Sequence, residues 1–188
     1  VAQREGKSIP HLCWNPAPDY RADGNCRACV VEIEGERVLA ASCVRTPTPG
    51  MKVKTQSERA EKGRAMVMEL LVADQPAPVA AHDDQSKFWN WVGAMGVSTT
   101  SRFPAKEARP HSDNSHSAIS VNLDACIQCG LCVRACREVQ MNDVIGMAGR
   151  GAGSKVVFDF DKGMGESTCV ACGECVQACP TGALAPKT

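Results

Sequence analysis

Residues 126–136 read CIQCGLCVRAC, and residues 169–180 read CVACGECVQACP. Each run places its cysteines at the spacing C-x2-C-x2-C-x3-C. Three cysteines at positions i, i+3 and i+6 can bind one face of a 4Fe-4S cube, and the fourth cysteine of such a run binds the cube of the other run. The doubled spacing therefore predicts two 4Fe-4S clusters whose ligands are shared between the runs.

Cross-ligation predicts the ligand set of each cube. The expected sets are Cys126, Cys129, Cys132 and Cys179 for the first cube, and Cys136, Cys169, Cys172 and Cys175 for the second. Small residues beside these ligands let backbone N–H groups approach the sulfurs. They are Ala125, Gly130, Ala135, Ala171, Gly173 and Ala178. Neither run is expected to fold around its cube without the other.

Zinc and disulfides are the other common uses of closely spaced cysteines. A zinc ion takes four ligands and would leave the third cysteine of each run without a role. Disulfides suit secreted proteins, but nothing in the sequence resembles a signal peptide, and cysteines three apart in a helical turn rarely reach disulfide geometry. We therefore expect a cytoplasmic protein whose cysteines act as cluster ligands.

Four further cysteines form a second pattern upstream: Cys13, Cys26, Cys29 and Cys43. One C-x2-C pair flanked by two distant cysteines indicates a 2Fe-2S loop, although its first ligand lies further upstream than in the plant-type spacing C-x4-C-x2-C. Residues 30–34 and 37–42 predict a hairpin that returns Cys43 to the side of Cys29. A zinc site built from the same four cysteines is the alternative.

A helix-rich connector is expected at residues 57–118, between domains at 1–56 and 119–188. Thr55 and Glu58 have capping-box form and open a predicted helix over residues 57–74. Its expected apolar face consists of Met66, Val67, Leu70 and Leu71.

A second connector helix is expected to be capped by Asp84 and ended by Gly96. Its apolar residues should pack one domain against the other or dock a partner. They are Phe88, Trp89, Trp91, Val92 and Met95. Residues 97–118 are predicted to be a linker over the surface. The connector histidines are expected to be surface or capping residues; they are His82, His111 and His116.

The overall composition argues against several classes of function. The 188 residues carry 21 Lys and Arg against 21 Asp and Glu, so the formal net charge is zero and nothing favours nucleic acid or a membrane surface. No apolar run approaches the roughly 18 residues of a transmembrane helix. Aromatic residues make up only 4%, so much of the folding free energy is expected to come from the clusters.

The glycine-rich residues 146–154, GMAGRGAGS, could suggest a phosphate-binding loop. They do not match G-x4-G-K-[ST] in any register, and no apolar strand is expected before them. We interpret them as a turn that precedes a strand at residues 155–160.

With both cysteine sets placed, the sequence resembles the N-terminal iron-sulfur region of the alpha subunit of NAD-dependent, molybdenum-containing formate dehydrogenases. The likeness lies in residues 9–43, 68–76 and 124–184. The same region occurs in the large iron-sulfur subunit of complex I, the diaphorase small subunit of NAD-reducing hydrogenases, and iron-only hydrogenases. The resemblance implies an α+β fold, with a plant-ferredoxin-like 2Fe-2S domain followed by a bacterial two-[4Fe-4S] ferredoxin domain.

The resemblance also implies a function and partners. Electrons would pass between a molybdopterin domain that oxidises formate, in the same polypeptide, and a partner subunit that carries flavin (FMN) and reduces NAD. This segment would contain no catalytic centre of its own. The alternatives are a diaphorase iron-sulfur subunit of an NAD-reducing hydrogenase or complex I-like enzyme and, from another class, a zinc-binding structural protein.

Two features depart from the family pattern. Its members usually carry a histidine followed by three cysteines that bind a further 4Fe-4S cluster. Here His82 stands in that place, but no cysteine occurs between Cys43 and Cys126. The second feature concerns the ends of the chain: it stops at Thr188, before the large molybdopterin domain of the formate dehydrogenase subunit, and it lacks the hairpin that normally opens the 2Fe-2S domain. We therefore expect the chain to be part of a longer polypeptide.

Overall fold

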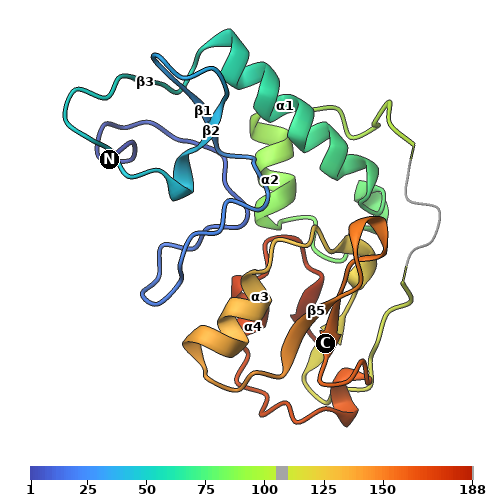
Figure 1. Cartoon of the computed structure of the whole chain (residues 1–188). Helices are drawn as coiled ribbons and strands as arrows, with labels where there is room; N and C mark the ends of the chain where they lie inside the picture. The colour runs from blue at the N-terminus through green and yellow to red at the C-terminus, as the bar shows by residue number, and fades with distance from the viewer. Residues whose placement is uncertain (105–109, 188) are drawn as a thin grey trace.

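The computed structural model describes residues 1–104 and 110–187, which form two lobes (Figure 1). The first lobe and the helices beside it contain β1 (Val30–Ile33), β2 (Ala40–Ala41), β3 (Val53–Lys54), α1 (Glu58–Ala73) and α2 (Lys87–Ala94). The second lobe contains β4 (Ile119–Val121), α3 (Leu131–Arg134), β5 (Ile145–Ala148), β6 (Lys155–Phe158), α4 (Glu174–Ala178) and β7 (Leu184–Pro186). Helix α3 continues as a π-helical turn, and short 3-10 helices lie at Ser42–Val44, Pro78–Ala80, Leu123–Ala125, Gly151–Gly153 and Met164–Glu166. This mixture of helices and short strands confirms the α+β class.

The first lobe is built on a three-stranded antiparallel sheet of order β2-β1-β3. Val30 pairs with Ala41 and Glu32 pairs with Lys54, so the expected hairpin is present, although its second strand is shorter than residues 37–42. Before the sheet, residues 2–6 form hydrogen-bonded turns, and the N–H of Lys7 donates to the carbonyl oxygen of Ala2 at 2.9 Å.

Helix α1 begins one residue after Ser57, whose Oγ accepts the N–H of Ala60 at 3.3 Å. Ser57 has the extended backbone of an N-cap, with φ −71° and ψ 147°. The capping box expected from Thr55 is therefore wrong, because the helix starts too late for Thr55 to reach its first free N–H groups. The predicted extent of the helix agrees closely with the structure.

The apolar face predicted for α1 is also wrong. Leu70 is 47% exposed, and Met66, Val67 and Leu71 are only partly buried. The buried residues instead follow a four-residue period and include a charge; they are Ala60, Arg64, Met68, Val72 and Ala73. Arg64 can lie inside because its Nη1 donates to the carbonyl oxygen of Val30 at 3.1 Å, which satisfies the guanidinium where it leaves water.

Helix α2 joins the two lobes. Its N-cap is Ser86 rather than Asp84, because Ser86 directly precedes the first helical residue and its Oγ accepts the N–H of Trp89 at 3.5 Å. Phe88 is fully buried, and its N–H donates to the carbonyl oxygen of Pro180 at 2.9 Å. Pro180 belongs to the second lobe. Lys87 contacts the first lobe, where its Nζ donates to the carbonyl oxygen of Trp14 at 3.4 Å. The expectation that this helix packs one domain against the other is confirmed.

In the second lobe two antiparallel strand pairs, β4-β7 and β5-β6, accompany the helices α3 and α4 that follow the cysteine runs. Strand β5 was not expected from the sequence, and it includes the first three of the glycine-rich residues 146–154. The other six connect the two strands of a hairpin, in which Ile145 pairs with Phe158. A phosphate-binding loop would lead from a strand into a helix, so the turn interpretation is retained.

The linker expected at 97–118 belongs partly to the second lobe, and residues 105–109 lie outside the described part of the chain. Asp113 and Val121 exchange two backbone hydrogen bonds, of 2.8 and 3.0 Å. His116 is only 6% exposed, and its Nδ1 accepts the N–H groups of Ala118 and Ile119, each at 3.1 Å. It is therefore a capping histidine rather than a surface one. His111 is exposed.

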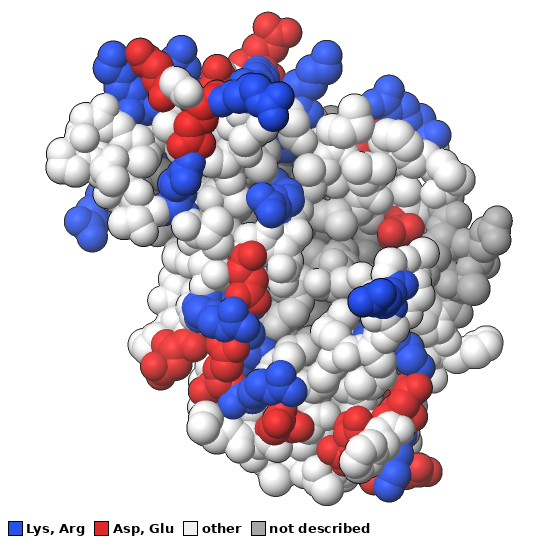
Figure 2. All heavy atoms as spheres, in the orientation of Figure 1, with Lys and Arg blue, Asp and Glu red and all other residues white. Residues whose placement is uncertain are grey.

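Acidic and basic side chains are interspersed over the face shown in Figure 2. Across residues 1–104 and 110–187, no helix is both long enough and apolar enough to cross a membrane.

Candidate metal centres

The two cysteine runs have the same local backbone. Gly130 and Gly173 begin α3 and α4 in the left-handed region, at φ 75° and 78°. Two residues earlier, Gln128 and Ala171 also have positive φ, at 54° and 58°. Their N–H groups each donate to the first cysteine Sγ of their run at 3.4 Å. The repeat in sequence is therefore a repeat in structure, and it directs backbone donors at sulfur as expected.

The fourth cysteine of each run also receives a backbone N–H. Val144 donates to the Sγ of Cys136 at 3.3 Å, and Leu184 donates to the Sγ of Cys179 at 3.5 Å. Donors aimed at sulfur suit thiolates that carry the negative charge of a cluster ligand. The donor set thus fits iron-sulfur ligation at both ends of each run.

A cavity in the second lobe is lined by the four cysteines expected for the first cube, one of which comes from the second run. They are Cys126, Cys129, Cys132 and Cys179. The remaining lining is largely apolar and includes Leu123, Ile127, Val156 and Leu184. Burial raises the pKa values of the Cys129 and Cys132 thiols, and the charges of neighbouring cysteines raise them further. Thiolates in this cavity need compensating positive charge, which iron supplies when bound.

The four cysteines expected for the second cube also gather. Burial raises the pKa of Cys175 to about 12, and the charges of Cys169, Cys172 and Cys136 act in the same direction. Cys172 is exposed, whereas Cys136 and Cys175 are buried. Asn142 donates from Nδ2 to the Sγ of Cys172 at 4.0 Å. This second site therefore lies closer to the surface than the first.

The upstream cysteines converge on the sheet of the first lobe. Hydrogen bonds from the thiols of Cys26 and Cys43 lower the pKa of Cys13, and a hydrogen bond from Cys43 lowers that of Cys29. The N–H of Cys26 adds a bond of 3.4 Å to the Sγ of Cys13. The β1-β2 hairpin returns Cys43 to Cys29 as predicted, since Ser42 donates its N–H to the Cys29 carbonyl oxygen at 3.2 Å.

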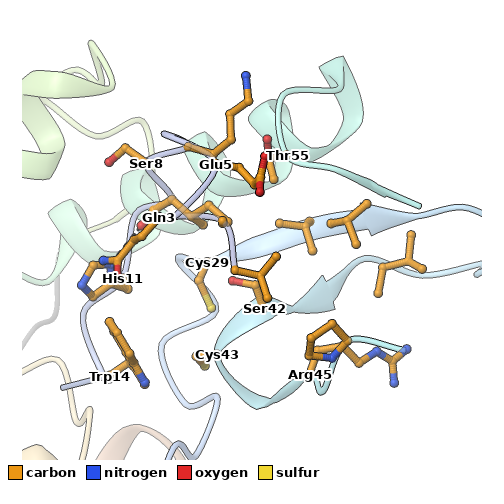
Figure 3. Close-up of a pocket in the computed structure, with 18 of the residues that line it drawn as sticks. Gln3, Glu5, Ser8, His11, Trp14, Cys29, Ser42, Cys43, Arg45 and Thr55 are labelled. Atoms are coloured by element: carbon orange, nitrogen blue, oxygen red, sulfur yellow. Dashed lines mark hydrogen bonds between the residues drawn. The ribbon is translucent and has the colours of Figure 1, made fainter. Parts of the chain in front are cut away.

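An open, mostly apolar pocket of about 530 Å³ lies beside this upstream site (Figure 3). Cys29 and Cys43 line it, together with the N-terminal segment and residues of the sheet. Figure 3 shows His11 and Trp14 on one side of the two cysteines, and Ser42 and Arg45 on the other. One edge of the upstream site therefore faces an opening in the surface.

The loop between Cys13 and Cys26 reaches the second lobe, which brings the upstream site next to the first cavity. Asn25 donates from Nδ2 to the carbonyl oxygen of Cys129 at 3.2 Å. From the other side, Arg134 of α3 donates from Nη2 to the carbonyl oxygen of Cys13 at 2.7 Å.

Sequence reasoning missed Asn25, Arg134 and Lys87 as residues of this junction. The one sequence signal for this junction was Arg134, a charged residue between the expected ligands Cys132 and Cys136. A charge in the middle of a ligand run is unexpected unless it pairs with another segment, and its partner cannot be read from spacing.

The contact partner of His82 is a carboxylate. Its Nε2 contacts both carboxylate oxygens of Asp124, at 2.9 and 3.0 Å. Asp124 lies two residues before Cys126, so this pair ties the connector to the start of the first run.

All twelve cysteines are free thiols. Within the described residues, no three His, Cys, Asp or Glu side chains converge closely enough to hold a single metal ion. The ligands of a multi-iron cluster are more widely spaced, because its thiolates bind different irons.

The cysteine groups and the two lobes define a class of protein: an iron-sulfur protein with a 2Fe-2S domain followed by a 4Fe-4S dicluster domain. Residues 1–58 match the family described as "2Fe-2S iron-sulfur cluster binding domain", and residues 125–183 match "4Fe-4S dicluster domain". These matches favour iron-sulfur clusters over zinc, so one 2Fe-2S cluster and two 4Fe-4S clusters are the cofactors. The chain belongs to the family of iron-sulfur electron-transfer segments found in subunits of NADH dehydrogenases and NAD-reducing hydrogenases.

Three relatives illustrate this membership. The chain is 33% identical over 153 residues to the mitochondrial NADH dehydrogenase [ubiquinone] iron-sulfur protein 1 of Solanum tuberosum, covering 80% of this chain and 20% of the relative. It is 35% identical over 181 residues to the NADP-reducing hydrogenase subunit HndD of Solidesulfovibrio fructosivorans, covering 94% of this chain and 31% of the relative. A crystal structure of an NAD+-reducing [NiFe]-hydrogenase in the H2-reduced state superposes with a TM-score of 0.88 at 30% identity, covering 100% of this chain and 79% of that one.

The chain spans about a fifth to a third of the length of the curated relatives it matches.

Proposed function

We propose that the chain carries electrons along three clusters in the order 2Fe-2S, first cube, second cube. The observation that carries the proposal is the direct contact between neighbouring sites. Asn25 and Arg134 join the 2Fe-2S loop to the first run, and α3 packs on α4, which joins the two cube sites. Helix α3 and the π-helical turn that continues it lead from Cys132 to Cys136, which are expected ligands of different cubes.

When bound, the clusters supply one-electron oxidation and reduction. The protein's part is to hold them and to tune them. The ligands we assign are Cys13, Cys26, Cys29 and Cys43 for the 2Fe-2S cluster, Cys126, Cys129, Cys132 and Cys179 for the first cube, and Cys136, Cys169, Cys172 and Cys175 for the second. The N–H groups of Gln128, Ala171, Val144 and Leu184 would stabilise negative charge on the sulfurs, and burial would keep water away.

Each of the two outer cluster sites has a cysteine at an open pocket or at the surface of the described chain. Cys43 lines the open pocket beside the 2Fe-2S site, and Cys172 is exposed at the second cube site. Two exposed apolar side chains are sequence neighbours of this site. Val170, two residues before Cys172, is 63% exposed, and Met141, which precedes the Cys172 contact Asn142, is 79% exposed. We infer that one end exchanges electrons with a flavin and NAD subunit and the other with a catalytic domain.

Formate oxidation is our candidate for the reaction at the far end, with a molybdopterin domain in the same polypeptide. It is supported by the resemblance over residues 9–43, 68–76 and 124–184, and by the absence of any cysteine between Cys43 and Cys126, the stretch that contains His82. A hydrogenase or NADH dehydrogenase with this region fits the comparisons equally well, and it is the alternative. A cytoplasmic location is part of the proposal, because thiols remain reduced there.

The first test is the iron and acid-labile sulfide content of anaerobically prepared protein, with EPR spectra of the reduced form. We expect about ten irons per chain, two in the 2Fe-2S cluster and four in each cube, with one 2Fe-2S signal and two interacting cube signals. Zinc in place of iron would contradict electron transfer. About fourteen irons would mean a further cube whose ligands are not recognised here.

A second test separates the candidate reactions. The protein is isolated from its source together with its native partners, its molybdenum is measured, and NAD reduction is followed with formate or with hydrogen as the donor. Molybdenum with formate-dependent NAD reduction supports formate dehydrogenase. Hydrogen-dependent reduction without molybdenum would replace it with the hydrogenase alternative.

A further inference from the structure

The loop between the first two upstream cysteines is longer than in the plant-type spacing C-x4-C, and its residues contact the other lobe. We define residues 14–25 as the strap. Its contacts are Asn25 with the carbonyl oxygen of Cys129 (3.2 Å), Asp23 with Arg134, Arg21 with Glu138 (2.8 Å), and the Tyr20 hydroxyl with Glu174 (2.9 Å). The strap therefore contacts the first run and its helix α3, the π-helical turn that continues α3, and the start of α4.

We propose that the strap is a positioning device that holds the 2Fe-2S site at a set distance from the first cube, with Arg134 as its anchor. This inference deepens the proposed function, because it assumes that both sites carry clusters. The positioning role would explain why the spacing from Cys13 to Cys26 is long. A loop that only closed the 2Fe-2S site would not need to reach α4.

Arg134 carries most of the argument because it is a buried charge. Its side chain is only 2% exposed, yet it bonds to two points of the other lobe: Nη2 donates to the Cys13 carbonyl oxygen at 2.7 Å, and Nη1 pairs with the Asp23 carboxylate. Among the described residues, its buried Nε finds no acceptor. A cation is tolerated at such depth only if its partners stay in place, so the guanidinium and the strap hold each other.

The outer contacts of the strap are expected to contribute unequally to holding it in place. Arg21 is 66% exposed, so its pairs with Asp23 and Glu138 contribute little. Tyr20 is 8% exposed, and its hydroxyl donates to Glu174 Oε1. A buried hydroxyl that lost its acceptor would cost more than the bond contributed. We therefore assign the far end of the strap to Tyr20.

Positioning matters because electron transfer and the magnetic coupling between reduced clusters both fall steeply with the distance between them. If the strap loosens, each cluster keeps its own ligands, but the distance between the 2Fe-2S site and the first cube is no longer constant. This separates a positioning role from a purely structural one.

The test compares Arg134→Gln with Arg134→Lys, Asp23→Asn and Tyr20→Phe in the full chain with its clusters. Arg137→Gln is the matched control, because it removes the same charge three residues along but from a side chain that is 55% exposed and pairs with Asp143. Three quantities are measured: iron content, the coupling of the reduced 2Fe-2S signal to the cubes by EPR, and hydrogen exchange of the strap.

We expect Arg134→Gln and Asp23→Asn to keep the wild-type iron content and to lose the coupling of the 2Fe-2S signal. Amides in residues 14–25 should exchange about tenfold faster, the factor for one lost charge-assisted hydrogen bond. Arg134→Lys should recover part of the coupling, because it keeps the charge without the planar fork. Tyr20→Phe should act more weakly, and Arg137→Gln should behave as wild type.

Each result has one meaning. If Asp23→Asn and Arg134→Gln keep their iron and show unchanged EPR coupling and hydrogen exchange, the proposed positioning role of the strap is wrong. If Arg134→Gln loses iron, Asp23→Asn and Tyr20→Phe decide in its place, because they leave the ligand helices intact. A wild-type protein without iron would overturn the proposed function instead, so the two failures are distinguishable.

Discussion

At the residue scale, the fourth cysteine of each run lies with cysteines of the other run. Cys136 continues the helical segment of the first run, yet its charge acts on Cys175 together with those of Cys169 and Cys172. Cys179 lines the cavity of the first run. The backbone after each cysteine supplies one N–H to its sulfur. The position of these thiols supports a cube ligated by both runs.

Replacing Cys136 by serine should therefore damage the second cube and leave the first cube and the 2Fe-2S cluster intact. About six irons per chain would remain, two in the 2Fe-2S cluster and four in the first cube. Iron analysis and EPR of the reduced variant measure this directly. Cys26→Ser provides the comparison, since it should remove only the 2Fe-2S signal. Loss of the first cube alone in the Cys136 variant would mean that the cross-ligation is assigned wrongly.

Asp113 allows a test that does not involve the clusters. Partial burial opposes ionisation of its carboxylate, but bonds from Ser115 and from the N–H of Met164, the latter at 2.7 Å, outweigh burial and lower its pKa. A lowered folded pKa stabilises the protein above the unfolded value of about 3.9, and this contribution disappears as pH falls through the folded value.

Asp113→Asn should therefore lower the free energy of unfolding by about 1 kcal/mol, because one charge-assisted acceptor is lost near the surface. The difference from wild type should be constant between pH 5 and 8, where the carboxylate stays ionised. Thermal unfolding at several pH values checks this. A difference that changed across this range would show that another group controls it.

At the scale of secondary structure, the two runs show how a repeat can differ in its surroundings. Gly130 and Gly173 occupy the same left-handed position before α3 and α4. A Cβ at Gly173 would meet nothing within 4 Å, whereas one at Gly130 would lie 3.3 Å from Asn25 Nδ2 of the strap. The tertiary contact distinguishes two elements that are locally equivalent.

Gly130→Ala should accordingly destabilise the protein more than Gly173→Ala. Both changes cost about 1–2 kcal/mol for a side chain at positive φ. The first also pushes against Asn25, and it should speed hydrogen exchange in residues 14–25. Chemical unfolding and exchange of the two variants, measured side by side, give the comparison. Equal effects on the strap would contradict the contact.

Helix α1 provides a second test at this scale. Ser57→Ala should cost about 1 kcal/mol, because the N-cap bond to the N–H of Ala60 is lost. Thr55→Ala should be nearly neutral for the helix, since Thr55 is not the cap. Lys62→Ala, on the exposed face of α1, controls for general effects of substitution and should change stability by less than about 0.5 kcal/mol. Circular dichroism during denaturation measures all three.

At the scale of the whole molecule, the cluster ligands are part of the core. Cys13, Cys26, Cys129, Cys136 and Cys175 all belong to the buried hydrophobic cluster, which spans both lobes. The sheets around them contain only two or three strands each. Short strands with few aromatic residues bury little apolar area, so the fold depends on what the cysteines bind.

Removal of iron by a chelator should therefore unfold most of the chain. Metal binding is coupled to folding where no preformed site exists in the unfolded chain. Far-UV circular dichroism and hydrogen exchange should lose structure in step with the visible absorbance. Helix α1 is expected to retain most, because it is the longest helix and none of its residues is an expected ligand. A chain that stayed folded without iron would show that the apolar core is sufficient.

Several features were predictable from sequence because they depend on local spacing. The distances between cysteines within one run are set by a few backbone bonds, so C-x2-C-x2-C-x3-C specifies both the cluster and the turn around it. The extent of α1 and the hairpin at β1 and β2 follow similarly from short-range pattern. Errors at this level were small, as when Ser57 rather than Thr55 proved to be the cap.

What the sequence by itself determined is thus the kind and number of clusters and the order of the two domains. Only the tertiary structure decided which face of α1 is buried, why His116 is inside, and that Arg134 reaches across to Cys13. The physical reason is that burial and charge pairing depend on segments distant in the chain: Arg64 and Val30 are 34 positions apart, and Arg134 and Cys13 are 121 positions apart. The residue pattern within one segment does not identify the distant group that will pair with a buried charge in that segment.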